Sequence, residues 1–219
     1  ALYLHLKIYG NKEYRDIRQV IIDEAQDYYP LQFEILQMLF KQVKFTVLGD
    51  INQTISKQEN ILFYQQVQKC LKKEKSTLIQ LNKSFRCTNE ILQFSLEFLN
   101  TKPEIQSFNR NGDAVTVMAL ENKEEYLDKI IQKIVEYKEK GFESICLICK
   151  TREACKHLFL KLKSKIEVQF ITDDSVKSLQ GTLILPSYLA KGLEFDAVII
   201  CDANAQNYSK EGDKNLLYM

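Results

Sequence analysis

Short apolar runs separated by polar segments recur along the chain. Val20–Ile22 and Phe45–Leu48 are rich in β-branched or aromatic residues, a pattern that is typical of buried strands. Between them, apolar residues recur at helical spacing from Phe33 to Phe40, after a proline at position 30 that suits the first turn of a helix. The succession of strand, helix and strand predicts a parallel α/β arrangement.

The second half of the chain shows the same alternation. Its pattern predicts strands at Leu78–Leu81, Ala114–Leu120, Ser144–Cys149, Val168–Thr172, Thr182–Leu185 and Ala197–Cys201, and helices from Thr88 to before Pro103, at Glu124–Lys140 and at Arg152–Lys165. Leu2–Tyr9 is too short to distinguish a strand from a helix end. We therefore expect the α/β class, with two parallel-sheet pieces and a boundary between about Thr77 and Gly112.

Charge does not select a function class. The 219 residues include 30 Lys and Arg against 29 Asp and Glu, although a local basic groove is compatible with this balance. Lys69–Lys75 is charged, and we interpret it as a solvated helix end rather than a binding patch. Every apolar run is strand-sized and the first residues lack a signal-peptide pattern, so we expect a soluble cytoplasmic protein without membrane contact.

Cysteine placement indicates free thiols. Several of the six cysteines lie inside apolar runs, which suits reduced side chains better than a disulfide framework. Cys146 and Cys149 form a C-x-x-C, but a strand at Ser144–Cys149 would point them to opposite faces, and no second pair or nearby histidine completes a zinc set. With two histidines in the chain, no histidine-based catalysis is indicated.

Two consecutive acids, Asp23 and Glu24, follow the first apolar run directly. At the carboxyl end of a strand in an open parallel sheet, side chains reach the edge where ligands bind. One acid there can hold Mg²⁺ against phosphate groups, and the next can polarise an attacking water. A strand that ends in a polar turn would carry the same residues, so the pair becomes informative only in context.

The context consists of four motifs in a fixed order. They are Asp23–Asp27 (DEAQD), Leu48–Ile55 (LGDINQTI), Asn82–Arg86 (NKSFR) and Ala190–Asp196 (AKGLEFD). Together they resemble the motifs of the superfamily 1 helicases of the UvrD/Rep type, from Val20 to Ile200. The resemblance implies two RecA-like pieces of the P-loop NTPase fold, with ATP bound between them. Residues 1–80 would be a partial first motor domain, and residues 81–219 a second one that lacks its C-terminal end.

The resemblance also implies roles for the first-domain residues and the arginine. Asp23 would hold Mg²⁺, Glu24 would act as general base, and Gln53 would sense the γ-phosphate and couple it to the nucleic-acid site. Phe85 would stack on adenine and Arg86 would act as an arginine finger. A turn-capping role for Gln53 and a surface ion pair for Arg86 are the alternatives.

In the last motif, the resemblance assigns Gly192 and Glu194 to the nucleotide, with the glutamate near the ribose. Ser187 and Tyr188 are weaker candidates for nucleic-acid contact. An exposed loop without function is the alternative for this segment.

Three features of the family are not found in these residues. The seven glycines form no G-x-x-x-x-G-K-[ST] phosphate loop, and the last nucleotide-sensing arginine is missing, so we expect a fragment that alone hydrolyses ATP poorly. Thr54–Glu59 stands where the family has base-stacking aromatics, which removes one source of affinity for single strands.

Three hypotheses follow. The first is a piece of an ATP-dependent DNA helicase or translocase that acts on nucleic acid, with single-stranded DNA as the expected partner. The second uses the spelling of Pro186–Asp196 and the short connection before it, which resemble the helicase IV-related subgroup, some of whose members use ATP to strip RNA polymerase from nucleic acid. The third is a non-catalytic docking module, which the intact acid pair disfavours.

Overall fold

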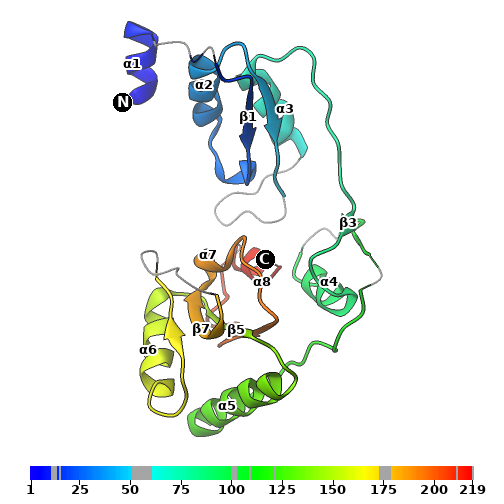
Figure 1. Cartoon of the computed structure of the whole chain (residues 1–219), viewed down its shortest axis with the longest axis vertical. Helices are drawn as coiled ribbons and strands as arrows, with labels where there is room; N and C mark the ends of the chain where they lie inside the picture. Colours follow the sequence, from blue (N-terminus) through cyan, green and yellow to red (C-terminus); the bar gives the residue numbers. More distant parts are fainter. Residues whose placement is uncertain are drawn as a thin grey trace. The chain divides into compact units, whose positions relative to one another are not determined.

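The computed structural model describes the whole chain except residues 11–13, 15, 51–60, 100–102, 109, 121, 173–178, 211 and 219. It divides into two compact units, drawn in Figure 1. Unit 1 comprises Ala1–Val115 together with Lys210–Met219, and unit 2 comprises Thr116–Ser209.

The N-terminal part of unit 1 contains a small parallel sheet. Its strands β1 (Gln19–Ile22) and β2 (Lys44–Val47) pair in register from Gln19 opposite Lys44 to Ile22 opposite Val47. The helical elements around them are α1 (Leu2–Tyr9), the 3-10 turn η1 (Ala25–Asp27), α2 (Pro30–Leu39) and α3 (Ile61–Leu71). Pro30 opens α2 as expected, and the segment whose type was left open, α1, is helical.

The core of this part of unit 1 is aromatic. Phe33 of α2 is fully buried, and its ring lies 5.9 Å from that of Phe63 in an edge-to-face arrangement. α2 and α3 contact each other, and both pack against Ile22 and Ala25 at the end of β1. Burial of one large apolar side chain contributes roughly 1.5–3 kcal/mol, so these rings stabilise the point where β1 ends.

The remainder of unit 1 contains β3 (Lys83–Ser84), α4 (Asn89–Leu96), β4 (Gln106–Ser107) and α8 (Asp213–Tyr218). β3 and β4 pair in parallel, and α4 contacts α8. Thr88 caps α4 as expected, because its hydroxyl accepts a hydrogen bond from the Ile91 amide at 3.4 Å.

Two predicted strands are wrong. Neither Leu78–Leu81 nor Ala114–Leu120 pairs with a strand among the described residues. Leu81 is 84% exposed and Val117 is 74% exposed, so both segments lack the partner and the covered face that a strand requires. Pairing in the first region starts later, at Lys83.

Unit 2 is a four-stranded parallel sheet in the order β6-β7-β5-β8. Its elements are α5 (Lys123–Glu139), β5 (Ser144–Cys149), α6 (Arg152–Leu162), β6 (Gln169–Phe170), β7 (Gly181–Pro186), α7 (Ser187–Ala190) and β8 (Ala197–Ile200). These bounds agree with the predicted alternation to within a few residues. The α/β fold class with parallel sheets is confirmed.

The central strands β5 and β7 of the unit 2 sheet are covered on both faces. On one face, α5 and α6 pack against β5 and β7 around Leu147 and Ile184. On the other, α7 and the segment that follows it cover Leu183 and Leu185. Burial on both faces explains why β5 and β7 are nearly continuous apolar runs.

The cysteines follow the same two faces. Cys149 belongs to the core under α5 and α6, whereas Cys146 belongs to the opposite core, as the strand alternation predicted. All six cysteines are free, and four of them are buried. Burial raises the pKa of the Cys146 thiol well above its usual range, so this sulfur stays protonated.

None of the helices in the described part of the chain has the length and apolar character needed to cross a membrane.

Candidate functional site

The two acids lie at one edge of the unit 1 sheet. Because β1 and β2 are parallel, their carboxyl ends meet there: Asp23 and Glu24 follow β1, and Gly49 and Asp50 follow β2. The ladder continues past both strands. The backbone amide of Leu48 donates a hydrogen bond to the last carbonyl of β1 at 2.8 Å. The carbonyl of Leu48 accepts a hydrogen bond from the backbone amide of the residue after Glu24 at 2.9 Å. The segment after β1 is therefore fixed beside the segment after β2.

The two carboxylates have different surroundings. Asp23 is exposed, and its Oδ1 accepts a hydrogen bond from the Glu24 amide at 2.8 Å. Glu24 is half-buried and adopts left-handed backbone angles, φ 50 and ψ 42. A non-glycine residue in this conformation costs roughly 1–2 kcal/mol, so the surrounding contacts hold it there.

Gln26 connects Glu24 to the neighbouring strand end. Its side chain is 1% exposed. The Nε2 group donates to Glu24 Oε2 at 2.5 Å, and Oε1 accepts from the Asp50 amide at 3.0 Å. The sequence pattern did not single out this residue, although an amide between two acids in the DEAQD motif was the available signal.

Gly49 allows this close approach. A Cβ at this position would collide with Gln26 Oε1 and would lie 2.7 Å from Tyr64 Oη. The Tyr64 hydroxyl of α3 is buried and makes no hydrogen bond with the described residues. Burial, with smaller effects of Asp50 and Glu24, raises its pKa to about 12, so it is a neutral hydroxyl at the acid edge.

Gln53, the proposed coupling residue, lies outside the described residues.

Phe85 pairs with a second exposed ring. Because Ser84 lies opposite Ser107 in the parallel register, the residues that directly follow the two strands, Phe85 and Phe108, are neighbours. Their ring centroids are 4.7 Å apart with an interplanar angle of 34°, and the side chains are 65% and 60% exposed. Phe108 was not predicted as a site residue. The register that brings it there could not be derived from the sequence.

Arg86 follows Phe85 and is exposed, and its carbonyl accepts a hydrogen bond from Arg110 Nη1 at 3.0 Å. The next residue, Cys87, lies near Tyr218 of α8. Burial raises the pKa of the Tyr218 hydroxyl above its usual range, and Asp50 and Cys87 raise it further. Within unit 1, α8 therefore lies near both the segment after β2 and the segment after β3.

In unit 2, Ser187 and Tyr188 follow the end of β7. Ser187 is 5% exposed, and its hydroxyl donates to the Lys150 carbonyl at 3.1 Å. Tyr188 is 44% exposed. Of these two candidates, only the tyrosine presents its side chain to solvent.

The segment from Gly192 to Asp196 alternates between the core and solvent. Leu193 and Phe195 pack against the core, whereas Gly192 and Glu194 are exposed. Gly192 has φ +79, a left-handed conformation that glycine adopts without strain. The apolar pair thus anchors the segment and leaves the Glu194 side chain accessible.

Asp196 has a structural role. Its Oδ2 accepts from the Glu143 amide at 2.9 Å, the Ser144 amide at 2.8 Å and the Ser144 hydroxyl at 2.9 Å. Hydrogen bonds from Ser144 and Glu143 lower the pKa of this carboxyl. These contacts tie the start of β8 to the start of β5.

Models of two helicase domains match successive parts of the chain. Residues 7–60 match the UvrD/REP helicase N-terminal domain, and residues 79–184 match the UvrD-like helicase C-terminal domain. The crystal structure of the C-terminal domain of a possible DNA helicase from Lactobacillus plantarum is 32% identical, with a TM-score of 0.52, and the match covers 62% of this chain and 78% of that chain. The chain belongs to the UvrD-like superfamily 1 helicases.

A longer relative comes from Acanthamoeba polyphaga mimivirus and bears the name "Putative ATP-dependent DNA helicase R568". It is 29% identical over 213 residues, which cover 87% of this chain and 30% of the relative. The chain thus spans about 30% of the length of this curated relative.

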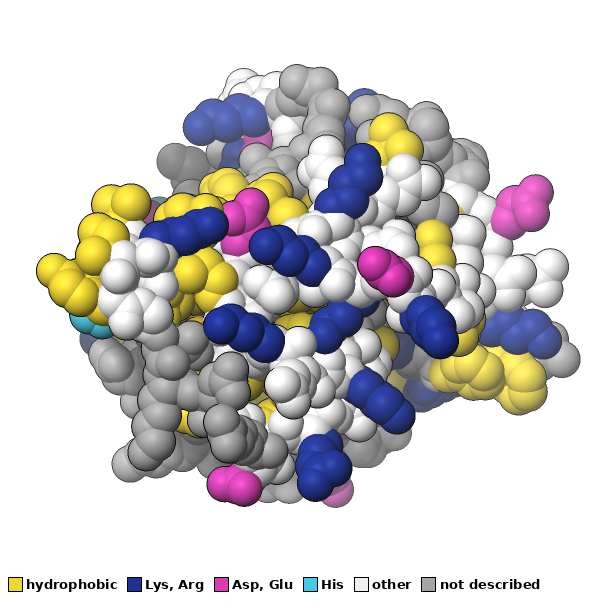
Figure 2. Space-filling view, turned by 90° about the horizontal axis from the view of Figure 1, so that it is seen from above, with side chains coloured by type: hydrophobic (Ala, Val, Ile, Leu, Met, Phe, Trp, Pro, Cys, Tyr) yellow, Lys and Arg dark blue, Asp and Glu magenta, His cyan; other side chains and the backbone are white. Residues whose placement is uncertain are grey.

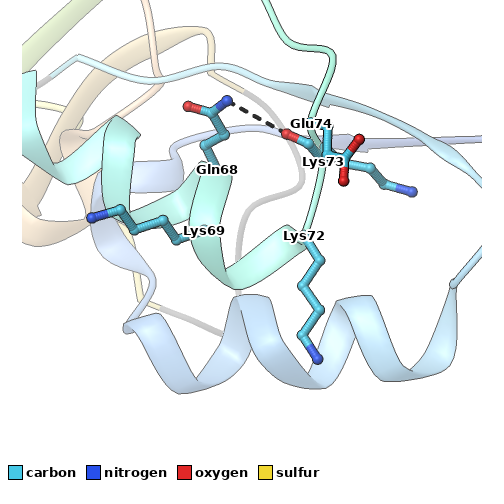
Figure 3. A pocket seen from close by; sticks show the side chains of 5 residues that line it. All are labelled: Gln68, Lys69, Lys72, Lys73 and Glu74. Carbon is cyan, nitrogen blue, oxygen red and sulfur yellow. Dashed lines mark hydrogen bonds between the residues drawn. The ribbon is translucent and has the colours of Figure 1, made fainter.

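The UvrD-like chain also has a basic surface away from the acid edge. A hollow of about 420 Å³ lies at the C-terminal end of α3, lined by Gln68, Lys69, Lys72, Lys73 and Glu74. Figure 3 shows these five side chains. Lys73 Nζ donates to the Lys41 carbonyl at 3.1 Å and lies 5.5 Å from the centre of the Phe45 ring. In Figure 2, Lys and Arg side chains spread across the middle of the face seen from above, with few acidic side chains among them.

Lysines at the C-terminal end of a helix interact favourably with the last carbonyls and the helix dipole. Such an arrangement agrees with the interpretation of Lys69–Lys75 as a solvated helix end. None of the predicted site residues lines the hollow.

Proposed function

We propose that the chain is part of an ATP-dependent DNA helicase or translocase in which Asp23 and Glu24 act on ATP. The observation that supports this best is the acid edge of unit 1, where the Glu24 carboxylate is held by a buried amide beside the end of a parallel strand. In open α/β folds, this edge is where ligands bind. The family membership of the chain supports the same chemistry.

Asp23 fits a magnesium ligand. Mg²⁺ in nucleotide sites keeps several waters and is held through one or two carboxylates together with substrate phosphates, and Asp23 offers an exposed carboxylate directly after β1. When bound, the ion would neutralise charge on the phosphates. Within the described part of the chain, no group of three or more His, Cys, Asp or Glu side chains is arranged to hold a metal without such help.

Glu24 would accept the proton of the attacking water. As the water oxygen bonds to the γ-phosphorus, the bond between that phosphorus and the bridging oxygen of ADP breaks, and the proton passes to the carboxylate. Arg86 would stabilise the charge on the transferred phosphoryl group, since its guanidinium can donate two parallel hydrogen bonds to phosphate oxygens.

Phe85 would stack on the adenine. Its exposed ring and that of Phe108 form an aromatic surface that suits a purine base, and Lys83 Nζ lies 5.9 Å from the Phe108 ring centre. Gly192 and Glu194 would contact the nucleotide from the second motor domain, which also carries Phe85 because the domains divide near residue 80. Tyr188, and Ser187 more weakly, would contact single-stranded DNA, and Gln53 would couple the nucleotide to the nucleic acid.

The proposal is tested by ATP hydrolysis in the full-length parent, with and without single-stranded DNA. We expect DNA to stimulate the wild type, and Glu24→Gln and Arg86→Ala to lower kcat by roughly 10²–10⁴-fold each. Glu139→Gln and Arg152→Ala, which change exposed residues of unit 2 helices, serve as matched controls and keep wild-type kcat. Full activity in both site variants would refute the assignment.

Two further outcomes refine the function. ATP hydrolysis that depends on Glu24 but is indifferent to DNA would favour the alternative in which RNA polymerase is the partner. A polypeptide of residues 1–219 alone should show only background hydrolysis, because it contains no G-x-x-x-x-G-K-[ST] segment to hold the phosphates.

A further inference from the structure

We propose that Gln26 is a positioning residue for ATP hydrolysis, which aligns the Glu24 carboxylate and links it to the segment that follows β2. The inference rests on the proposed function, because Gln26 would act through Glu24. It adds a residue to which neither the motif comparison nor the family match assigns a role.

The hydrogen bonds fix the orientation of the Gln26 amide. A carboxylate only accepts, so the Nε2 group must face Glu24, where it lies 2.5 Å from Oε2. A backbone amide only donates, so Oε1 must face Asp50 N, at 3.0 Å. A flipped side chain would lose both bonds at once. The two partners therefore select a single orientation of the amide, and the amide in turn selects one position of the carboxylate.

Burial makes this arrangement stiff. Gln26 is 1% exposed, so water cannot replace either partner. The backbone of Gly49 lies directly beside the Gln26 amide, so close that a Cβ at position 49 would collide with Gln26 Oε1. The rotamer freedom that an exposed glutamine has is thus removed, which is what alignment of a general base requires.

The link also reaches the coupling motif. Gln26 accepts a hydrogen bond from the backbone amide of Asp50, and Gln53 follows Asp50 in the same sequence motif. A shift of the backbone at Asp50 would pull on Gln26 and change the position of the Glu24 carboxylate. Gln26 would thereby make hydrolysis sensitive to the state of the segment after β2.

A glutamine that only fills the core would behave differently. Its loss would reduce stability, and any loss of activity would follow the loss of folded protein. A positioning residue lowers kcat in the folded protein while KM for ATP is unchanged, because the nucleotide still binds.

Two variants of the full-length parent separate these roles. Gln26→Met keeps the length of the side chain and removes both hydrogen bonds. Gln26→Glu keeps an acceptor for the Asp50 amide but places a second carboxylate against Glu24. Leu71→Ala, in the same core at the far end of α3 and 4% exposed, is the control for stability. For each variant, kcat and KM for ATP are measured beside the melting temperature.

We expect Gln26→Met to lower kcat about tenfold or more, with KM within about twofold of the wild type. Gln26→Glu should lower kcat at least as much as Gln26→Met, whatever its melting temperature. The reason is that repulsion between two carboxylates replaces the hydrogen bond to Glu24. Leu71→Ala should lose melting temperature and keep kcat. In the Glu24→Gln background, Gln26→Met should cause little further loss, since its partner is already changed.

The inference is overturned if both Gln26 variants keep wild-type kcat, or if their losses follow the melting temperature as that of Leu71→Ala does. If Gln26→Met does not fold, Gln26→Glu decides by the same criterion. A Glu24→Gln variant that retains activity would overturn the proposed function and this inference with it. Loss of activity in Glu24→Gln together with harmless Gln26 variants would remove this inference alone.

Discussion

The acid edge of unit 1 and the sheet of unit 2 are built in different ways. At the acid edge, two short strands are paired, Ile21 in β1 is 64% exposed, and the Glu24 carboxylate is held by the Gln26 amide. In unit 2, the two central strands β5 and β7 are covered on both faces, and Leu147 and Leu183 are fully buried. Polar contacts fix the side chains of the first region, whereas apolar packing fixes the backbone of the second.

This difference predicts where substitutions act. A change at the acid edge should disturb a few hydrogen bonds and hence activity. A comparable change in the unit 2 core should disturb stability and leave the chemistry of the acids unchanged.

The largest effect on stability is expected for Leu183→Ala in β7. Truncation of a fully buried leucine typically costs 2–5 kcal/mol, because apolar contacts are lost and a cavity remains. Urea denaturation of the folded chain measures the change, and Val198→Ala, at a position that is 44% exposed in β8, is the matched control. A loss below about 1 kcal/mol would mean that packing does not dominate this unit.

Gly49→Ala should have the next largest effect. A methyl group that collides with Gln26 Oε1 forces the two segments apart, and overpacking of this kind typically costs about 1–3 kcal/mol. The same variant of the parent should lose ATP hydrolysis. Gly141→Ala is the comparison: no atom lies within 4 Å of its Cβ position, so only the strain of φ +83 is added and hydrolysis should continue.

Helix caps provide a comparison in which the two units should behave alike. Thr88 in unit 1 and Thr151 in unit 2 accept hydrogen bonds from Ile91 and Ala154 at 3.4 and 3.2 Å, respectively. Alanine at either position should cost about 1 kcal/mol, whereas serine should restore most of it. Thermal unfolding of the alanine and serine variants at both positions measures these losses of stability. A large difference between the losses at Thr88 and Thr151 would show that the surroundings of a cap matter more than the capping hydrogen bond.

The smallest effect is expected for Asp196→Asn, and it should depend on pH. The lowered pKa of Asp196 means that the folded chain favours the charged form, so the stabilisation is present above the ordinary aspartate pKa of about 4 and is lost as pH falls through the lowered value. The difference in unfolding midpoint between wild type and Asn should be visible at pH 7 and should shrink below pH 4. A constant difference across this range would contradict the role of the charge.

Local patterns predicted the elements of unit 2 well. Ser144–Cys149 is a strand with the predicted bounds, because a continuous apolar run with partners on both faces satisfies local preference and packing together. Leu78–Leu81 has a similar composition and is not a strand, since the described chain places no partner beside it. The apolar content of a segment indicates that it tends to be buried. Whether a neighbouring strand pairs with it depends on the tertiary structure.

The sequence predicted only those site residues whose position follows from their neighbours in the chain. Asp23 and Glu24 could be placed at the end of a strand because they directly follow a β-branched run. Gln26 and Phe108 were missed, because the first gains its significance from Asp50 and the second from Phe85, each across a pair of strands. Contacts of this kind depend on register, which one sequence does not reveal.

The burial of the cysteines also determines how the chain can be labelled. Cys146, Cys149, Cys155 and Cys201 are buried, so a maleimide dye would find only Cys70 and Cys87 partly accessible, and burial raises the pKa of Cys70. Cys87 is adjacent to Arg86. A single Cys70→Ser substitution would therefore leave one addressable position beside the proposed arginine finger, suited to a fluorophore that reports on nucleotide binding.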